Sequence, residues 1–148
     1  MNFEAKLALI GGLVLLASAL GWYWKAKTGK AKLVHRGEQV DLSKLDALKH
    51  GKPVTRFGKK ATLLQFSTEV CSQCKQTAKL FGELEQKHKD LLHVEVDLTN
   101  RLDLAAHFGV LQTPTTLVLN SSGRVLARVG GAPKPNVIQE ELEKLDIK

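Results

Sequence analysis

Cysteine is scarce in this chain: Cys71 and Cys74 are the only two among 148 residues, and they are spaced as C-x-x-C. A structural zinc site usually takes four ligands, for example from two such pairs. The second pair is missing, so the sequence predicts no metal site. A static disulfide is also a weak interpretation, because closing so short a loop removes little entropy from the unfolded chain. Reversible redox chemistry is what remains for the pair.

Aromatic residues make up only 5% of the chain, and no tract of Lys and Arg is interleaved with them. Nucleic-acid binding depends on a basic face of that kind, so we expect no nucleic-acid partner. Internal repeats and low-complexity segments are lacking too, and 43% apolar with 25% charged residues is typical of a globular chain. The net charge of +7 is concentrated in one twelve-residue window that contains Lys25, Lys27, Lys30, Lys32 and Arg36.

A long apolar run lies near the amino terminus. Residues 7–24 read LALIGGLVLLASALGWYW, eighteen residues without a charge. A helix needs about 17 to 25 such residues to cross the hydrocarbon core of a membrane. The Trp22-Tyr23-Trp24 triplet at its end favours the headgroup region. The run therefore predicts one transmembrane helix after a short tail, residues 1–6.

The same residues leave a second interpretation open, a cleaved signal peptide with Ala17-Ser18-Ala19 as its cleavage site. Against it, the apolar run continues beyond that point and Lys6 is the only basic side chain before it. For an uncleaved span, the excess of Lys and Arg after residue 24 predicts that the rest of the chain is cytoplasmic. The expected location is a single-pass position in the cell membrane.

Residues 25–39 follow the span and show neither helical nor strand periodicity. We expect a basic juxtamembrane tether, and its cations would also attract anionic lipid headgroups. A plain linker remains an equal alternative. One domain is then expected over residues 40–148.

The domain shows a regular alternation of elements. Strands are expected at residues 61–66 and 91–98, each followed by a helical pattern. A hairpin is expected over residues 115–130 around Asn120-Ser121-Ser122-Gly123. Asn100 or Asp103 is the expected cap of the short helix before it, and a last helix opens at Pro135. This order predicts an α/β fold with a mixed sheet and helices on both faces.

The cysteine pair falls where a helix begins directly after a buried strand. A helix amino terminus offers free N–H groups and a partial positive charge, which stabilise a thiolate. The i, i+3 spacing brings both sulfurs to one side of the helix. The pattern therefore favours a disulfide that forms and reopens.

With these residues in view, the chain resembles the thioredoxin superfamily over about residues 40–145. The resemblance rests on four motifs: ATLLQF before the loop, Cys71-Ser72-Gln73-Cys74-Lys75 at the helix start, Gly109-Val110-Leu111-Gln112-Thr113-Pro114-Thr115 before the hairpin, and Val129-Gly130-Gly131 before the last helix. It implies that Cys71 is the nucleophile and Cys74 the resolving thiol. It also implies a cis Thr113-Pro114 bond, with Thr113 and Pro114 beside an extended substrate.

The chain departs from the family pattern at several places. Val70 replaces a Trp, and Ser72-Gln73 replaces Gly-Pro between the cysteines. Gln65 stands where the family has a buried Asp that accepts a proton, and His93 where it has the neighbouring Lys. We expect Gln65 and His93 to lie side by side behind Cys74, as a proton relay or as a polar pair without that role.

The resemblance implies a protein-disulfide oxidoreductase that contributes to cell redox homeostasis and needs no cofactor. Its partners would be protein disulfides and an electron donor such as a thioredoxin reductase, with residues 7–24 in the membrane. We expect it to reduce disulfides at the cytoplasmic face. Two alternatives stay open: an exported, anchored oxidoreductase for disulfide correction or cytochrome maturation, and a non-catalytic adaptor with the same fold.

Overall fold

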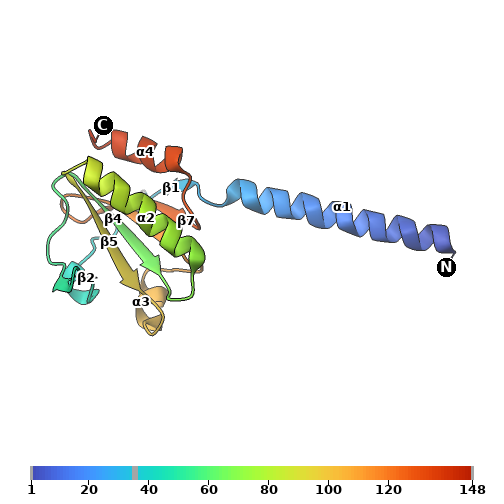
Figure 1. The fold of residues 1–148 in the computed structure, drawn as a ribbon, viewed down its shortest axis with the longest axis horizontal. Helices are drawn as coiled ribbons and strands as arrows, with labels where there is room; N and C mark the ends of the chain where they lie inside the picture. Colours follow the sequence, from blue (N-terminus) through green and yellow to red (C-terminus); the bar gives the residue numbers. More distant parts are fainter. Residues whose placement is uncertain (1, 35–36, 148) are drawn as a thin grey trace.

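The computed structural model describes residues 2–34 and 37–147; Arg36 of the basic window lies outside them. An amino-terminal helix precedes a mixed α/β domain (Figure 1). The helices are α1 (Phe3–Lys27), the 3-10 helix η1 (Leu42–Lys44), α2 (Ser72–Lys87), α3 (Leu102–His107) and α4 (Pro135–Glu143). The strands are β1 (Ala31–Leu33), β2 (Leu48–Lys49), β3 (Lys52–Pro53), β4 (Ala61–Ser67), β5 (Leu91–Asp97), β6 (Thr115–Asn120) and β7 (Val125–Gly130).

Helix α1 covers the predicted membrane span and extends it at both ends. It has 25 residues, and none of them is buried against the domain. At 1.5 Å per residue it is about 37 Å long, which exceeds the hydrocarbon thickness of about 30 Å. Figure 1 shows it projecting away from the domain as a single rod. It is long and apolar enough to cross a membrane.

The central sheet has five strands in the order β1-β7-β6-β4-β5. The β4 strand pairs in parallel with β5 and antiparallel with β6. The parallel pair follows from the α2 crossover, and the β6–β7 pair from the tight turn at Asn120, whose Oδ1 accepts from the N–H groups of Ser122 and Arg124. The predicted mixed sheet is confirmed.

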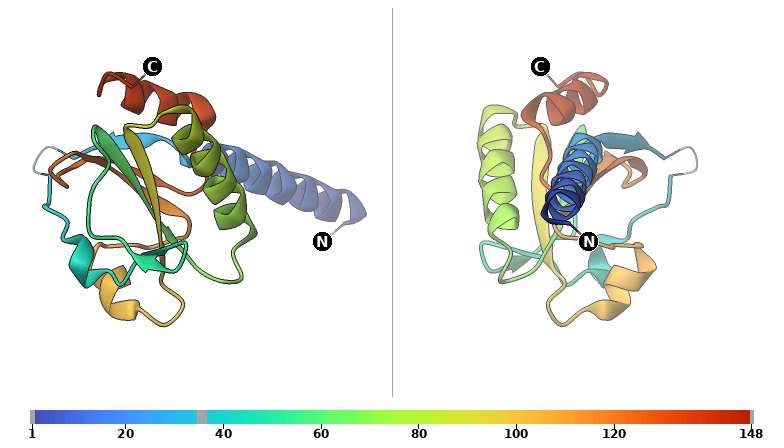
Figure 2. Two further views of the ribbon diagram at one scale, coloured as in Figure 1. Left: turned by 60° about the vertical axis from the view of Figure 1, so that its left-hand side comes forward. Right: turned by 90° about the vertical axis from the view of Figure 1, so that its right-hand side faces the viewer.

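Each face of the sheet has its own hydrophobic core. On one face, Phe81 of α2 and Ile138 of α4 pack against Leu63 and Val118. On the other, Phe108 after α3 packs against Phe66, with ring centroids 5.0 Å apart. Figure 2 shows α2 and α4 on one side of the sheet and α3 on the other. Both faces of β4 are therefore covered, and all seven of its residues are buried.

The segment expected to be a tether contains a strand. Ala31–Leu33 pairs antiparallel with β7, and Ala31 lies opposite Val129. The Gly29 N–H also donates to the Gly130 carbonyl at 2.9 Å. Three residues are too few to show a strand pattern in the sequence. They form a strand because they pair with the otherwise open edge of β7. Only Thr28–Lys30 connects α1 to the sheet.

The start of α3 also differs from expectation. Its N-cap is Arg101, which makes no side-chain capping bond, rather than Asn100 or Asp103. The side chain of Asp103 instead accepts from the Arg101 guanidinium, with Nη2 at 3.0 Å from Oδ2. The ion pair thus takes the carboxylate that was expected to cap the helix.

Candidate redox site

The cysteine pair sits at the end of the most buried strand. Strand β4 ends at Ser67, and three residues separate it from Cys71, the N-cap of α2. The Cys71 N–H donates to the Thr68 carbonyl at 3.1 Å, which closes the turn between the two elements. A strand held on both edges and both faces cannot shift, so the start of α2 is fixed in position.

Cys71 is the N-cap of α2. Its extended backbone (φ −88°, ψ 101°) directs Sγ back over the helix, where it accepts from the Cys74 N–H at 3.1 Å. The two residues form a disulfide with their Cα atoms 5.2 Å apart. Cys74 is 1% exposed, whereas Cys71 is partly exposed. The pair is therefore asymmetric, with one sulfur accessible and the other enclosed.

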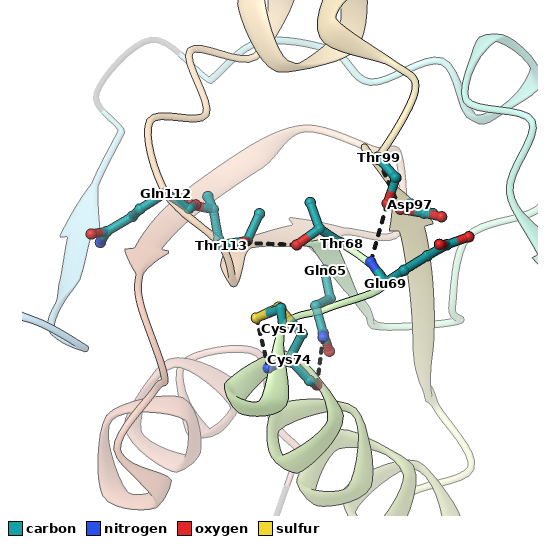
Figure 3. The surroundings of a disulfide bond; sticks show 10 residues. Gln65, Thr68, Glu69, Cys71, Cys74, Asp97, Thr99, Gln112 and Thr113 are labelled. Carbon is teal, nitrogen blue, oxygen red and sulfur yellow. Dashed lines mark hydrogen bonds between the residues drawn. A yellow bond between two sulfur atoms is a disulfide. The ribbon is translucent and has the colours of Figure 1, made fainter.

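A neighbouring loop holds the segment before Cys71. The Glu69 N–H donates to Thr99 Oγ1 at 3.1 Å, and Thr99 Oγ1 donates to Asp97 Oδ1 at 2.6 Å (Figure 3). The end of β5 thus braces the turn that leads into the redox pair. Neither Thr99 nor Asp97 stood out in the sequence.

The Thr113-Pro114 peptide bond is cis. Thr113 Oγ1 lies 3.3 Å from Thr68 Oγ1, so the loop that holds the proline meets the loop that leads into Cys71 (Figure 3). The Pro114 carbonyl accepts from the Gly131 N–H at 2.8 Å. The structure thus brings Thr113, Pro114 and the cysteine pair together.

Two apolar side chains project from these loops into solvent. Val70 immediately precedes Cys71 and is 96% exposed, and Leu111 lies in the loop of residues 108–114 that holds the cis bond (the cis-proline loop) and is 97% exposed. Val70 adjoins the partly exposed cysteine and Leu111 adjoins the cis-proline loop's Thr113-Pro114 bond, so each is placed to meet a partner that approaches the cysteine pair. In the sequence Val70 appeared only as a departure from the family, and Leu111 only as part of the motif before the hairpin, with no role of its own.

Gln65 and His93 lie behind the buried cysteine. The Gln65 amide nitrogen donates to the Cys74 carbonyl at 2.9 Å, and its Oε1 lies 3.1 Å from His93 Nε2. Because the amide NH₂ is directed at the carbonyl, Oε1 can only accept, and His93 must donate from Nε2. The expected side-by-side placement is present, and His93 is neutral in it.

Two further charged residues complete this network. Lys49 forms an ion pair with Glu85 and also donates to the His93 carbonyl at 2.9 Å, while the His93 N–H donates to Glu85 Oε1 at 3.2 Å. Burial, with the Lys49 cation as a second cause, lowers the pKa of His93 to about 4, although Glu85 acts in the opposite direction. Glu85 could have been suspected as a carboxylate on the apolar face of α2; Lys49 gave no signal.

A cleft of about 600 Å³ reaches the buried cysteine from the β5 side. Cys74, Lys75, Glu95 and Asp97 are among the residues that line it. The cleft brings solvent up to residues that surround Cys74, although Cys74 itself is enclosed.

His88 and His93 stand at a spacing that some zinc sites use. Within residues 2–34 and 37–147, however, no three His, Cys, Asp or Glu side chains come together as a metal site requires. The His93 ring Nε2 instead contacts Gln65 Oε1 at 3.1 Å.

His93 should make the stability of the fold depend on pH. Its pKa of about 4 lies below the ordinary 6.5, so the unfolded chain binds the proton first as the pH falls. Its neutral form is fully favourable above pH 6.5, and as the pH falls from 6.5 to 4 the free energy of unfolding should drop by about 3 kcal/mol. Urea unfolding of the full chain in detergent measures this.

The comparison is His93→Gln, which should lose that part of the pH dependence. His107→Gln, an exposed histidine on α3, should keep it. The same slope in the wild type and His93→Gln would contradict the assignment.

Comparison with known proteins agrees with this site. The Thioredoxin family model matches residues 41–144. Thioredoxin H5 of Oryza sativa subsp. japonica is 30% identical over 118 residues, 80% of each chain. Thioredoxin of Bacillus subtilis is 35% identical over 83 residues, 55% of this chain and 79% of that one.

Among solved structures, thioredoxin NaTrxh of Nicotiana alata superimposes with a TM-score of 0.51 at 29% identity, covering 58% of this chain and 73% of that one. The family model covers the domain that carries the cysteine pair. The chain belongs to the thioredoxin family, and it is a thioredoxin-type thiol-disulfide oxidoreductase with Cys71 and Cys74 as its cysteine pair.

Proposed function

We propose that the chain is a membrane-anchored oxidoreductase that reduces protein disulfides at the cytoplasmic face, with Cys71 as nucleophile and Cys74 as resolving thiol. The observation that carries the roles is the difference in exposure between the two cysteines, since Cys71 is partly exposed and Cys74 is enclosed. Thr113 and Pro114 would contact the substrate backbone, and Val70 and Leu111 its side chains.

The first step is attack by the Cys71 thiolate on one sulfur of a substrate disulfide. An S–S bond forms between Cys71 and that sulfur, and the other substrate sulfur leaves as a thiolate that takes up a proton. The Cys74 N–H and the start of α2 stabilise the Cys71 thiolate before attack. Thiol chemistry therefore begins at the exposed end of the helix.

In the second step Cys74 attacks Cys71. The Cys71–Cys74 bond forms, the mixed disulfide breaks, and the second substrate thiol is released. The substrate gains two electrons, and a reductase that supplies two electrons must reopen the disulfide. An external donor such as a thioredoxin reductase is therefore a required partner.

The Cys74 proton has to leave the site during that step. Neutral His93 already donates to Gln65, and a pKa of about 4 makes it a weak base. This arrangement favours water in the cleft beside Glu95 as the acceptor, with Gln65 and His93 as positioning residues that hold the Cys74 backbone. The relay through Gln65 and His93 stays a prediction.

Trapping separates the two cysteine roles. With 5,5′-dithiobis(2-nitrobenzoate), the reduced full chain should release two equivalents of thionitrobenzoate in sequence. Cys74→Ala should release one and keep a stable adduct on Cys71, whereas Cys71→Ser should react only slowly because Cys74 is enclosed. Insulin reduction should fall to the uncatalysed rate in Cys71→Ser. A wild type no faster than this variant would mean an adaptor instead of an enzyme.

The role of position 65 is tested by Gln65→Asp. A buried carboxylate beside Cys74 is a new proton acceptor, so the rate of the second thionitrobenzoate release should gain an additional pH-dependent limb. Gln76→Asp on the exposed face of α2 should leave the profile unchanged. An unchanged profile in Gln65→Asp would argue against any role for this position in resolution.

The anchored, cytoplasmic arrangement is supported by the length of α1 and by the cations after it. We predict that a carboxyl-terminal fusion to alkaline phosphatase is inactive in cells, whereas a fusion to green fluorescent protein fluoresces. Matched fusions at Asn2, before α1, serve as the control on the opposite side. The reverse pattern would establish the exported oxidoreductase, and a soluble product shortened after Ala19 would establish a signal peptide.

A further inference from the structure

A second pocket lies between the end of α1 and the domain. Its volume is about 670 Å³, and it is open to solvent. Tyr23 and Trp24 of α1 line it from one side, and Leu111 and Gln112 of the cis-proline loop line it from the other. Figure 3 shows Gln112 directed away from the disulfide. The pocket is thus distinct from the redox pair but shares a loop with it.

The pocket is strongly basic. Lys27, Lys30, Lys32 and Arg128 line it, and no carboxylate is found among its lining residues within the part of the chain that the structure describes. The Arg128 guanidinium is held in place by the Gly109 carbonyl at 3.0 Å and by the Phe108 carbonyl. Four cations without an acidic partner favour an anionic ligand.

The cations come from two parts of the chain that are fixed to one another. Gly29 bonds to Gly130, and β1 pairs with β7 immediately afterwards. A Cβ at Gly131, which has φ +81°, would lie 2.4 Å from Thr28 Cγ2, so the connection packs directly against the domain. Backbone pairing at the edge of the sheet therefore fixes the segment after α1 and β7, which supply the cations of the pocket, relative to one another.

The aromatic residues of the pocket indicate where it would lie relative to the membrane surface. Tyr23 and Trp24 end the apolar part of α1, and side chains of this kind favour the headgroup layer. Lys27 lies over the Tyr23 ring, with Nζ 4.5 Å from its centroid. In a chain anchored by α1, the four cations are therefore at the level of lipid phosphates.

We propose that this pocket binds the phosphate of an anionic phospholipid headgroup, and this inference rests on the proposed membrane anchoring. The bound headgroup would hold β7 and the cis-proline loop against the bilayer surface, because the pocket lining includes residues of both. Anionic lipid is favoured over a soluble anion because five of the twelve lining residues come from the membrane helix and the connection that follows it.

Native mass spectrometry of the full chain, released from detergent with added lipid, tests the site. Phosphatidylglycerol should bind the wild type, and phosphatidylcholine should bind much more weakly. Lys30→Gln combined with Lys32→Gln should weaken phosphatidylglycerol binding by about 25-fold, since each basic residue near a membrane surface accounts for about five-fold. Arg128→Gln should lower it by about five-fold.

The matched control is Lys87→Gln combined with Lys89→Gln, which removes the same charge at the same spacing outside the pocket and should leave lipid binding unchanged. Equal binding of the two lipids, or equal losses in the two double variants, would overturn the headgroup site. Equally tight binding of inorganic phosphate would make it a site for soluble anions and overturn the lipid assignment.

Membrane anchoring is measured separately. The wild type and both double variants should stay with phosphatidylcholine vesicles after a carbonate wash. Release of the wild type would overturn the anchor, and with it the basis of this site. Retention without selective phosphatidylglycerol binding would overturn the headgroup site alone.

Discussion

The geometry of the redox site depends on the hydrogen bond from the Cys74 N–H to the Cys71 sulfur. It places the accessible sulfur on the helix end, where unpaired N–H groups point at it, and it places the second sulfur one turn further in. The bond needs a helix that starts at one fixed position. Strand β4 provides that start, because its neighbours β5 and β6 and the two hydrophobic cores leave it no freedom. The buried sheet thus holds the partly exposed Cys71 in position.

The two polar side chains behind the cysteines, Gln65 and His93, are both uncharged. A glutamine bonds to a histidine that burial and a nearby lysine keep uncharged. A neutral amide can hold the Cys74 carbonyl without taking a proton. In the mechanism that we propose, holding the backbone and accepting the proton are therefore tasks of different groups, and water in the cleft beside Glu95 performs the second.

Much of the fold could be predicted from sequence, for identifiable reasons. The buried run of β4, the alternation of β5 and the turn chemistry at Asn120 each reflect a local pattern that survives in the structure. Strand β1 could not be read in this way, because it is ordered by a partner about a hundred residues away.

The residues of the site likewise fall into those that the sequence could predict and those that it could not. Cys71, Cys74 and Thr113-Pro114 form short motifs, and family resemblance pointed to Gln65 and His93. Lys49 could not be predicted, since it reaches Glu85 and His93 from a two-stranded hairpin of four paired residues whose position only the tertiary fold determines. Glu85 is noticeable in the sequence as a charged residue on an otherwise apolar helix face.

The shortness of the connection between α1 and β1 has a consequence for encounters with other proteins. Three extended residues span about 10 Å, whereas a free tether of fifteen would span about 50 Å. In an anchored chain the dithiol is therefore confined to a thin layer above the bilayer and searches it by lateral diffusion. For the cytoplasmic orientation that we propose, disulfides that neighbouring membrane proteins carry close to the surface come within its range, and those deep in large soluble assemblies stay beyond it.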